Sequence, residues 1–144
     1  MNIDIKEYAQ LAAGVYATTP NNVLENPSGW TPDQLIKDQF DGFSAGVFKK
    51  GNDIVIDYTG TNTDKLTDTQ ATDAPAALGF FSTQVLKAMK LCIETRIANP
   101  TASITLTGHS LGGGLASLMA VYFGAPPRHA SGVRSLIDVS AGDY

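Results

Sequence analysis

Hydrophobic and polar positions follow different spacings along the chain, and these spacings predict its elements. Between residues 4 and 17, apolar side chains recur three or four positions apart, at Ile5, Tyr8, Leu11, Ala12 and Val15. This spacing is typical of one face of a helix. Asp4, followed three residues later by Glu7, has the pattern of a capping box. We therefore expect the chain to open with a helix.

The next segment, residues 18–40, is rich in Pro, Asn, Asp and Gly, with Trp30 and Phe40 as apolar anchors. Residues of this kind favour turns, so we expect a structured loop here. Pro32 is suited to the first position of a helix, which favours a short helix near residues 32–38. The segment is interpreted as a connection within one domain.

Two strand-like runs follow at residues 43–48 and 54–58. The turn Lys50-Gly51-Asn52-Asp53 between them predicts a hairpin. In the second run Ile54, Val55 and Ile56 stand in succession, which indicates a strand that is buried on both faces.

A polar stretch from residue 61 to 74 and a short apolar run then lead to a helix expected over residues 82–98, which Asn99-Pro100 ends. Cys92 shares its helical spacing with Val85, Met89, Ile93 and Ile97, which favours a buried apolar role. The order of strand, helix, strand, turn and helix is an α/β pattern, so we expect a mostly parallel sheet with flanking helices. Apolar residues between 132 and 141 could add one more strand.

Composition and charge narrow the class of protein. The 144 residues suit a single domain, and 14 acidic against 10 basic residues give a net charge of -4. This balance argues against a nucleic acid or an anionic membrane surface as partner. With one cysteine and two histidines we predict no disulfide, no metal and no cofactor. The N-terminus lacks the pattern of a signal peptide and no stretch is long enough to span a bilayer, which leaves cytoplasmic location and signal-independent export both open.

The strongest chemical signal is the motif Gly108-His109-Ser110-Leu111-Gly112. An alternating run with Ile104 and Leu106 precedes it, and a helix-forming stretch to about residue 123 follows. A serine on a sharp turn from strand to helix is the arrangement of a nucleophile elbow, in which crowding requires glycine two positions before and two after the serine. The first N–H groups of the helix would favour an oxyanion. The alternative is a glycine-rich turn that merely contains a serine.

Two further segments resemble those of a known protein family. Residues 54–61, Ile-Val-Ile-Asp-Tyr-Thr-Gly-Thr, resemble the strand that ends in an aromatic-Arg-Gly-Thr motif in class 3 lipases, an α/β-hydrolase family. Residues 42–47 resemble the preceding strand of that family, particularly in bacterial members. The chain departs from the motif at Thr59, where the family commonly has arginine.

The resemblance implies roles for several residues. Ser110 would be the nucleophile, and the backbone N–H of Leu111 and Thr61 would supply the oxyanion hole; Thr61 could instead cap the end of a strand. Residues 62–79 stand where related lipases often carry a lid or substrate-shaping loop, with Phe80 and Phe81 either lining an acyl channel or packing before the next helix.

The remainder of a catalytic triad is not evident from the sequence. The family order is Ser, then Asp or Glu, then His, whereas His129 precedes the candidate acids Asp138 and Asp143. We therefore expect residues 1–144 to form a single, incomplete α/β-hydrolase domain that lacks the C-terminal strands and leaves an open sheet edge through which another chain could pair.

Two functions follow as hypotheses. The first is a serine hydrolase acting on lipid-like acyl esters, from which a peptidase or thioesterase would differ only in substrate. The second is a catalytically inactive lipase-like domain that serves as a binding or assembly module.

Overall fold

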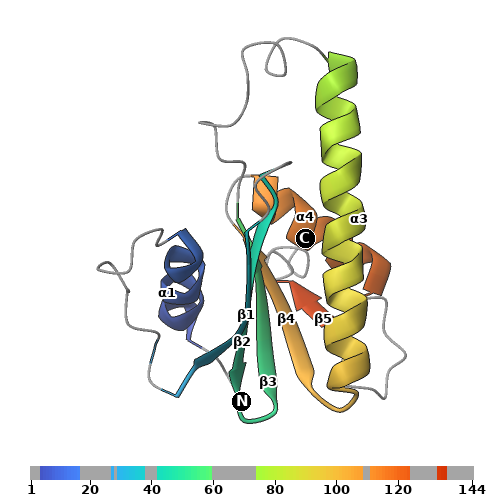
Figure 1. Cartoon of the computed structure of the whole chain (residues 1–144). Coiled ribbons are helices and arrows are strands. Elements are labelled where there is room, and N and C mark those ends of the chain that lie inside the picture. Colours follow the sequence, from blue (N-terminus) through green and yellow to red (C-terminus); the bar gives the residue numbers. More distant parts are fainter. Residues whose placement is uncertain are drawn as a thin grey trace, which may run out of the picture.

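The computed structural model describes residues 4–16, 27, 29–37, 42–59, 74–108, 111–123 and 133–135. Along the chain lie α1 (Ile5–Tyr16), β1 (Thr31–Lys37), β2 (Ser44–Lys50), β3 (Asp53–Tyr58), α3 (Ala74–Ala98), β4 (Ser103–Gly108), α4 (Leu111–Phe123) and β5 (Val133–Ser135). In Figure 1, α1 lies on one side of the sheet and α3 and α4 lie on the other. None of the helices in this part of the chain has the length and apolar character needed to cross a membrane.

The described strands form one sheet in the order β1-β2-β3-β4-β5. β1 with β2 and β2 with β3 are antiparallel, whereas β3 with β4 and β4 with β5 are parallel. The sheet is therefore mixed rather than mostly parallel as the sequence led us to expect. The reason is that short connections join the first strands into hairpins, while α3 provides the crossover that a parallel pair requires.

β1 corrects the prediction of a loop with a short helix near residues 32–38. Residues Thr31–Lys37 are an edge strand, most of whose side chains are exposed. Its register with β2 shifts between Pro32 and Gln34. Proline has no N–H to donate, so it is tolerated at the edge of a sheet beside such an irregularity. Pairing with β2 outweighs the local preference of the sequence for a turn or helix.

The hairpin of β2 and β3 is confirmed. Lys50 pairs with Asp53 across the turn, and Gly51 adopts a φ of 59°, a left-handed conformation that glycine accepts without strain. From Ile54 to Tyr58 every residue of β3 is buried, as the apolar run predicted.

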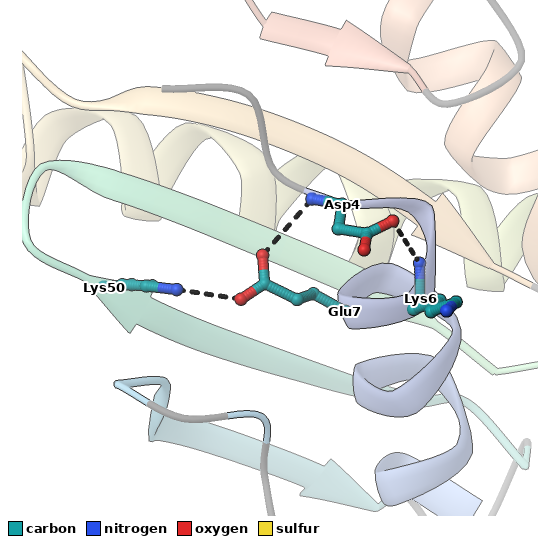
Figure 2. Close-up of polar contacts among 4 residues, drawn as sticks. All are labelled: Asp4, Lys6, Glu7 and Lys50. Carbon is teal, nitrogen blue, oxygen red and sulfur yellow. Dashed lines mark hydrogen bonds and ion pairs between the residues drawn. The ribbon is translucent and has the colours of Figure 1, made fainter.

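The first helix and its capping box are also confirmed (Figure 2). The Lys6 N–H donates to Asp4 Oδ1 at 3.2 Å, and Glu7 Oε2 accepts from the Asp4 N–H at 3.3 Å. Glu7 Oε1 also pairs with Lys50 Nζ at 2.8 Å, which ties the start of α1 to the hairpin. Lys50 Nζ lies 5.8 Å from the centre of the Trp30 ring.

Apolar side chains pack on both faces of the sheet. The larger cluster, under α3 and α4, includes Ile54, Ile56, Tyr58, Leu106 and Met119. The smaller cluster, under α1, consists of Leu11, Val15, Trp30, Phe48 and Val55.

α3 begins at Ala74, eight positions earlier than expected. Pro75 then lies in the first helical turn, where its missing N–H leaves no hydrogen bond unmade. Residues 74–79 of the predicted lid segment are therefore helical, and residues 62–73 lie outside the described part. Phe81 packs partly buried against the larger cluster. Cys92 is buried as expected, although Ile93 and Ile97 of the same pattern are exposed.

Candidate active site

The candidate site is built around the adjacent ends of β3 and β4. In the parallel register, Tyr58 at the end of β3 is the partner of Gly108 at the end of β4. Gly108 is followed by two residues outside the described part, His109 and Ser110, and then by Leu111, the first residue of α4. A strand thus turns into a helix within two residues at the carboxyl edge of the parallel strands, where α/β folds commonly place their sites.

Backbone crowding explains the two glycines that flank this turn. A Cβ at Gly108 would lie 2.4 Å from the carbonyl carbon of Gly112 and 2.6 Å from the carbonyl oxygen of Tyr58. A Cβ at Gly112 would lie 1.9 Å from the same Tyr58 oxygen. Since backbone atoms cannot move aside as a side chain does, neither position has room for a side chain. This crowding is what a nucleophile elbow requires of both glycines.

Tyr58 fixes the strand end against which the turn rests. Its hydroxyl donates to the carbonyl oxygen of Ala88 on α3 at 3.2 Å, and its ring lies 6.3 Å from that of Phe43, centre to centre. Burial raises the pKa of Tyr58 well above its ordinary value, so the phenol is neutral. Tyr58 therefore joins β3, α3 and the start of α4.

Thr59, the next residue, attaches the same strand end to β2. Its N–H and its hydroxyl both donate to the carbonyl oxygen of Ser44, each at 3.0 Å. Thr59 is buried, and it occupies the position at which class 3 lipases commonly have arginine. In this chain the residue before Gly60 therefore anchors the strand end to β2 through one backbone and one side-chain hydrogen bond.

The start of α4 provides the polar environment of the turn. Leu111 is half-buried, and the first turn of α4 contains no acidic residue. The first N–H groups of a helix have no partner within the helix and carry partial positive charge. The N-terminus of α4 can therefore stabilise negative charge near Leu111.

The remaining predicted site residues lie outside the described part of the chain. These are Ser110 itself, the oxyanion candidate Thr61, and the triad candidates His129, Asp138 and Asp143. His109 also lies outside the described part, so the described residues contain no histidine that could act as a base.

Sequence reasoning missed Asp57. This residue of β3 is fully buried, and neither carboxyl oxygen has a hydrogen-bond partner among the residues that the structure describes. Burial raises its pKa to about 8. A signal was present in the sequence, because an acidic residue between Ile56 and Tyr58 interrupts a strand that was expected to be buried on both faces.

Comparison with known proteins identifies the family. The model of the Tle-like phospholipase domain family matches residues 7–134. The chain therefore belongs to this phospholipase-like family, and the expected lipase-like α/β-hydrolase class is confirmed. No curated protein matches the chain.

Solved structures of lipases share the fold. A lipase from Rhizopus microsporus var. chinensis aligns with a TM-score of 0.55 at 20% identity over 81% of this chain and 49% of its own. Lip2 lipase from Yarrowia lipolytica gives 0.56 at 18% identity over 84% and 55%. A triacylglycerol lipase whose catalytic centre is a serine protease triad gives 0.56 at 17% identity over 81% and 52%. The chain spans about half the length of these lipases.

Proposed function

We propose that this chain carries the nucleophile of a serine ester hydrolase that acts on lipid-like acyl esters, phospholipids among them. Ser110 is the proposed nucleophile, and the N–H groups of Leu111 and Thr61 are the proposed oxyanion donors. The observation that carries the proposal is the close approach of the Gly112 backbone to the Tyr58 carbonyl, because it leaves no room for a side chain at Gly112, as a nucleophile elbow requires. Membership of a phospholipase-like family supports the substrate class.

The proposed reaction has two steps. In the first, Ser110 Oγ bonds to the acyl carbon and gives its proton to a general base, while the negative charge on the carbonyl oxygen is stabilised at the start of α4. The ester bond then breaks, and the leaving alcohol takes the proton. In the second step, water attacks the acyl-enzyme and releases the fatty acid and Ser110. The described residues contain no histidine to serve as this base.

The register of β3 and β4 supports the proposed oxyanion hole. Thr61 follows Tyr58 by three positions and Ser110 follows Gly108 by two, and Tyr58 and Gly108 are direct partners. The strand ends that lead to Thr61 and to Ser110 therefore lie side by side. Donors from two different loops that converge on one oxygen are the usual construction in α/β-hydrolases.

Hydrolysis of vesicles of phosphatidylcholine, and of p-nitrophenyl esters with short and long acyl chains, tests the proposal. We expect Ser110→Ala to lose activity by about a thousandfold or more, because the covalent step is removed. Ser117→Ala is the matched control, since Ser117 lies on α4 and its hydroxyl donates to the Gly113 carbonyl at 2.8 Å. It should retain wild-type activity within a few-fold. Equal activity in Ser110→Ala, or a folded wild-type protein that hydrolyses none of these esters, would overturn the proposal.

A further inference from the structure

Asp57 occupies a place that an ionised carboxylate cannot easily hold. It is 0% exposed, and within the described part of the chain both carboxyl oxygens lack a hydrogen-bond partner. Its neighbour in sequence, Tyr58, carries the carbonyl that abuts Gly112. A buried carboxylate with neither a countercharge nor a hydrogen bond is strongly disfavoured. Burying the uncharged carboxyl group at this strand end costs much less free energy.

Among the described residues, no charged side chain lies next to the Asp57 carboxyl group. Its register partners are Gly46 on β2 and Thr107 on β4, which lie on the same face of the sheet. A Cβ at Gly46 would lie 2.7 Å from Val15 Cγ2, so α1 covers this face closely. The titratable group that α1 brings here is Tyr8, whose hydroxyl donates to Thr105 Oγ1 at 3.4 Å.

The charged residues at the start of α1 are either exposed or paired with another residue. Asp4 and Lys6 are exposed, and Glu7 is paired with Lys50 beside the turn of the hairpin. Lys50 stands opposite Asp53, at the far end of β3 from Asp57. Burial therefore controls the charge of Asp57, and burial is greatest when the end of β3 is packed against its neighbours.

We propose that Asp57, in its uncharged form, is a positioning residue for the elbow, a role that rests on the proposed function. While it is uncharged, the end of β3 stays packed and the Tyr58 carbonyl supports the turn between Gly108 and Gly112. When Asp57 loses its proton, the strand end must open to hydrate the carboxylate, and the turn loses that support. The reactivity of Ser110 is thereby coupled to the protonation of a group on the opposite face of the sheet.

The pH dependence of Ser110 labelling by a fluorophosphonate probe tests this coupling. With the Asp57 pKa at about 8, the uncharged fraction falls about tenfold between pH 7 and pH 9. We expect the labelling rate of the wild type, divided by that of Asp57→Asn at the same pH, to fall by about this factor. Circular dichroism at each pH confirms that both proteins are folded, and Asp57→Ala serves as a second uncharged variant.

Asp53→Asn is the matched control, because it makes the same chemical change at the other end of β3, where the side chain is half-buried. It should follow the wild-type profile. Parallel profiles for the wild type and both Asp57 variants would overturn the role of Asp57 and leave the proposed function intact. A folded wild type that is unlabelled at every pH would instead remove the proposed function, and with it the role of Asp57.

Discussion

The backbone of Gly112 on α4 lies against the carbonyl of Tyr58 on β3 so closely that a Cβ at Gly112 would stand 1.9 Å from that oxygen. One contact thus joins the strand that leads toward Thr61 to the helix that follows Ser110. The proposed position of the nucleophile therefore depends on Gly112 having no Cβ atom.

Gly112→Ala should therefore destabilise the protein and displace the turn. Because the contacted atoms belong to the backbone, we expect a loss of about 3 kcal/mol in the free energy of unfolding, at the upper end of the cost of overpacking. Urea denaturation measures it. Gly114→Ala is the control, since a Cβ there meets nothing within 4 Å, and alanine in a helix should raise stability by up to about 1 kcal/mol. Equal stability of the two variants would contradict the steric account.

The burial of Asp57 should make the free energy of unfolding of this protein depend on pH. Its pKa is about 8 in the folded chain against an ordinary value of 3.8, so between these values the folded state holds a proton that the unfolded state has lost. The stabilisation by this proton is complete below pH 3.8 and is lost as the pH rises toward 8. Relative to Asp57→Asn, the free energy of unfolding of the wild type should fall by about 1.4 kcal/mol per pH unit in this range. Denaturation of both proteins at several pH values would show this slope, and a constant difference would refute it.

The Tyr58 hydroxyl should contribute measurably to stability. Tyr58→Phe removes the bond to the Ala88 carbonyl, and we expect a loss of about 1 kcal/mol. Tyr122→Phe, on the exposed surface of α4, makes the same change without burial and should be close to neutral. Urea unfolding midpoints compare the two, and the account fails if Tyr58→Phe is as stable as the wild type.

Lys50 should control the ionisation of Glu7. The hydrogen bond from Lys50 is the principal reason that the pKa of Glu7 lies below its ordinary value of 4.5. Lys50→Met should return this pKa toward 4.5, as measured by NMR titration of the Glu7 carboxyl carbon. The capping contact with Asp4 remains and keeps the return incomplete. Lys90→Met, which breaks an exposed pair with Glu94 on α3, should leave the Glu7 titration unchanged; a shift as large as that in Lys50→Met would show that the effect is not local.

The sequence predicted those elements whose local and tertiary preferences agree. The capping box of α1, the turn at Gly51 and the apolar run of β3 each have a local cause, and each was found as expected. β1 was missed because its strand form depends on pairing with β2. Its own residues, such as Pro32, favour turns and do not indicate that pairing. Asp57 was missed because an acidic residue is normally assigned to solvent, although its place in an apolar strand hinted at burial; the packing of α1 over the sheet shows that it is buried.

Covalent labelling of Ser110 tests the central claim most directly. Purified protein is treated with a fluorophosphonate probe, and the modified peptide is located by mass spectrometry, with Ser110→Ala and Ser117→Ala treated in parallel. We predict modification at Ser110 in the wild type and in Ser117→Ala, and none in Ser110→Ala. A folded wild-type protein that takes up no probe, or takes it up at another residue, would contradict the proposal that this turn presents a nucleophile.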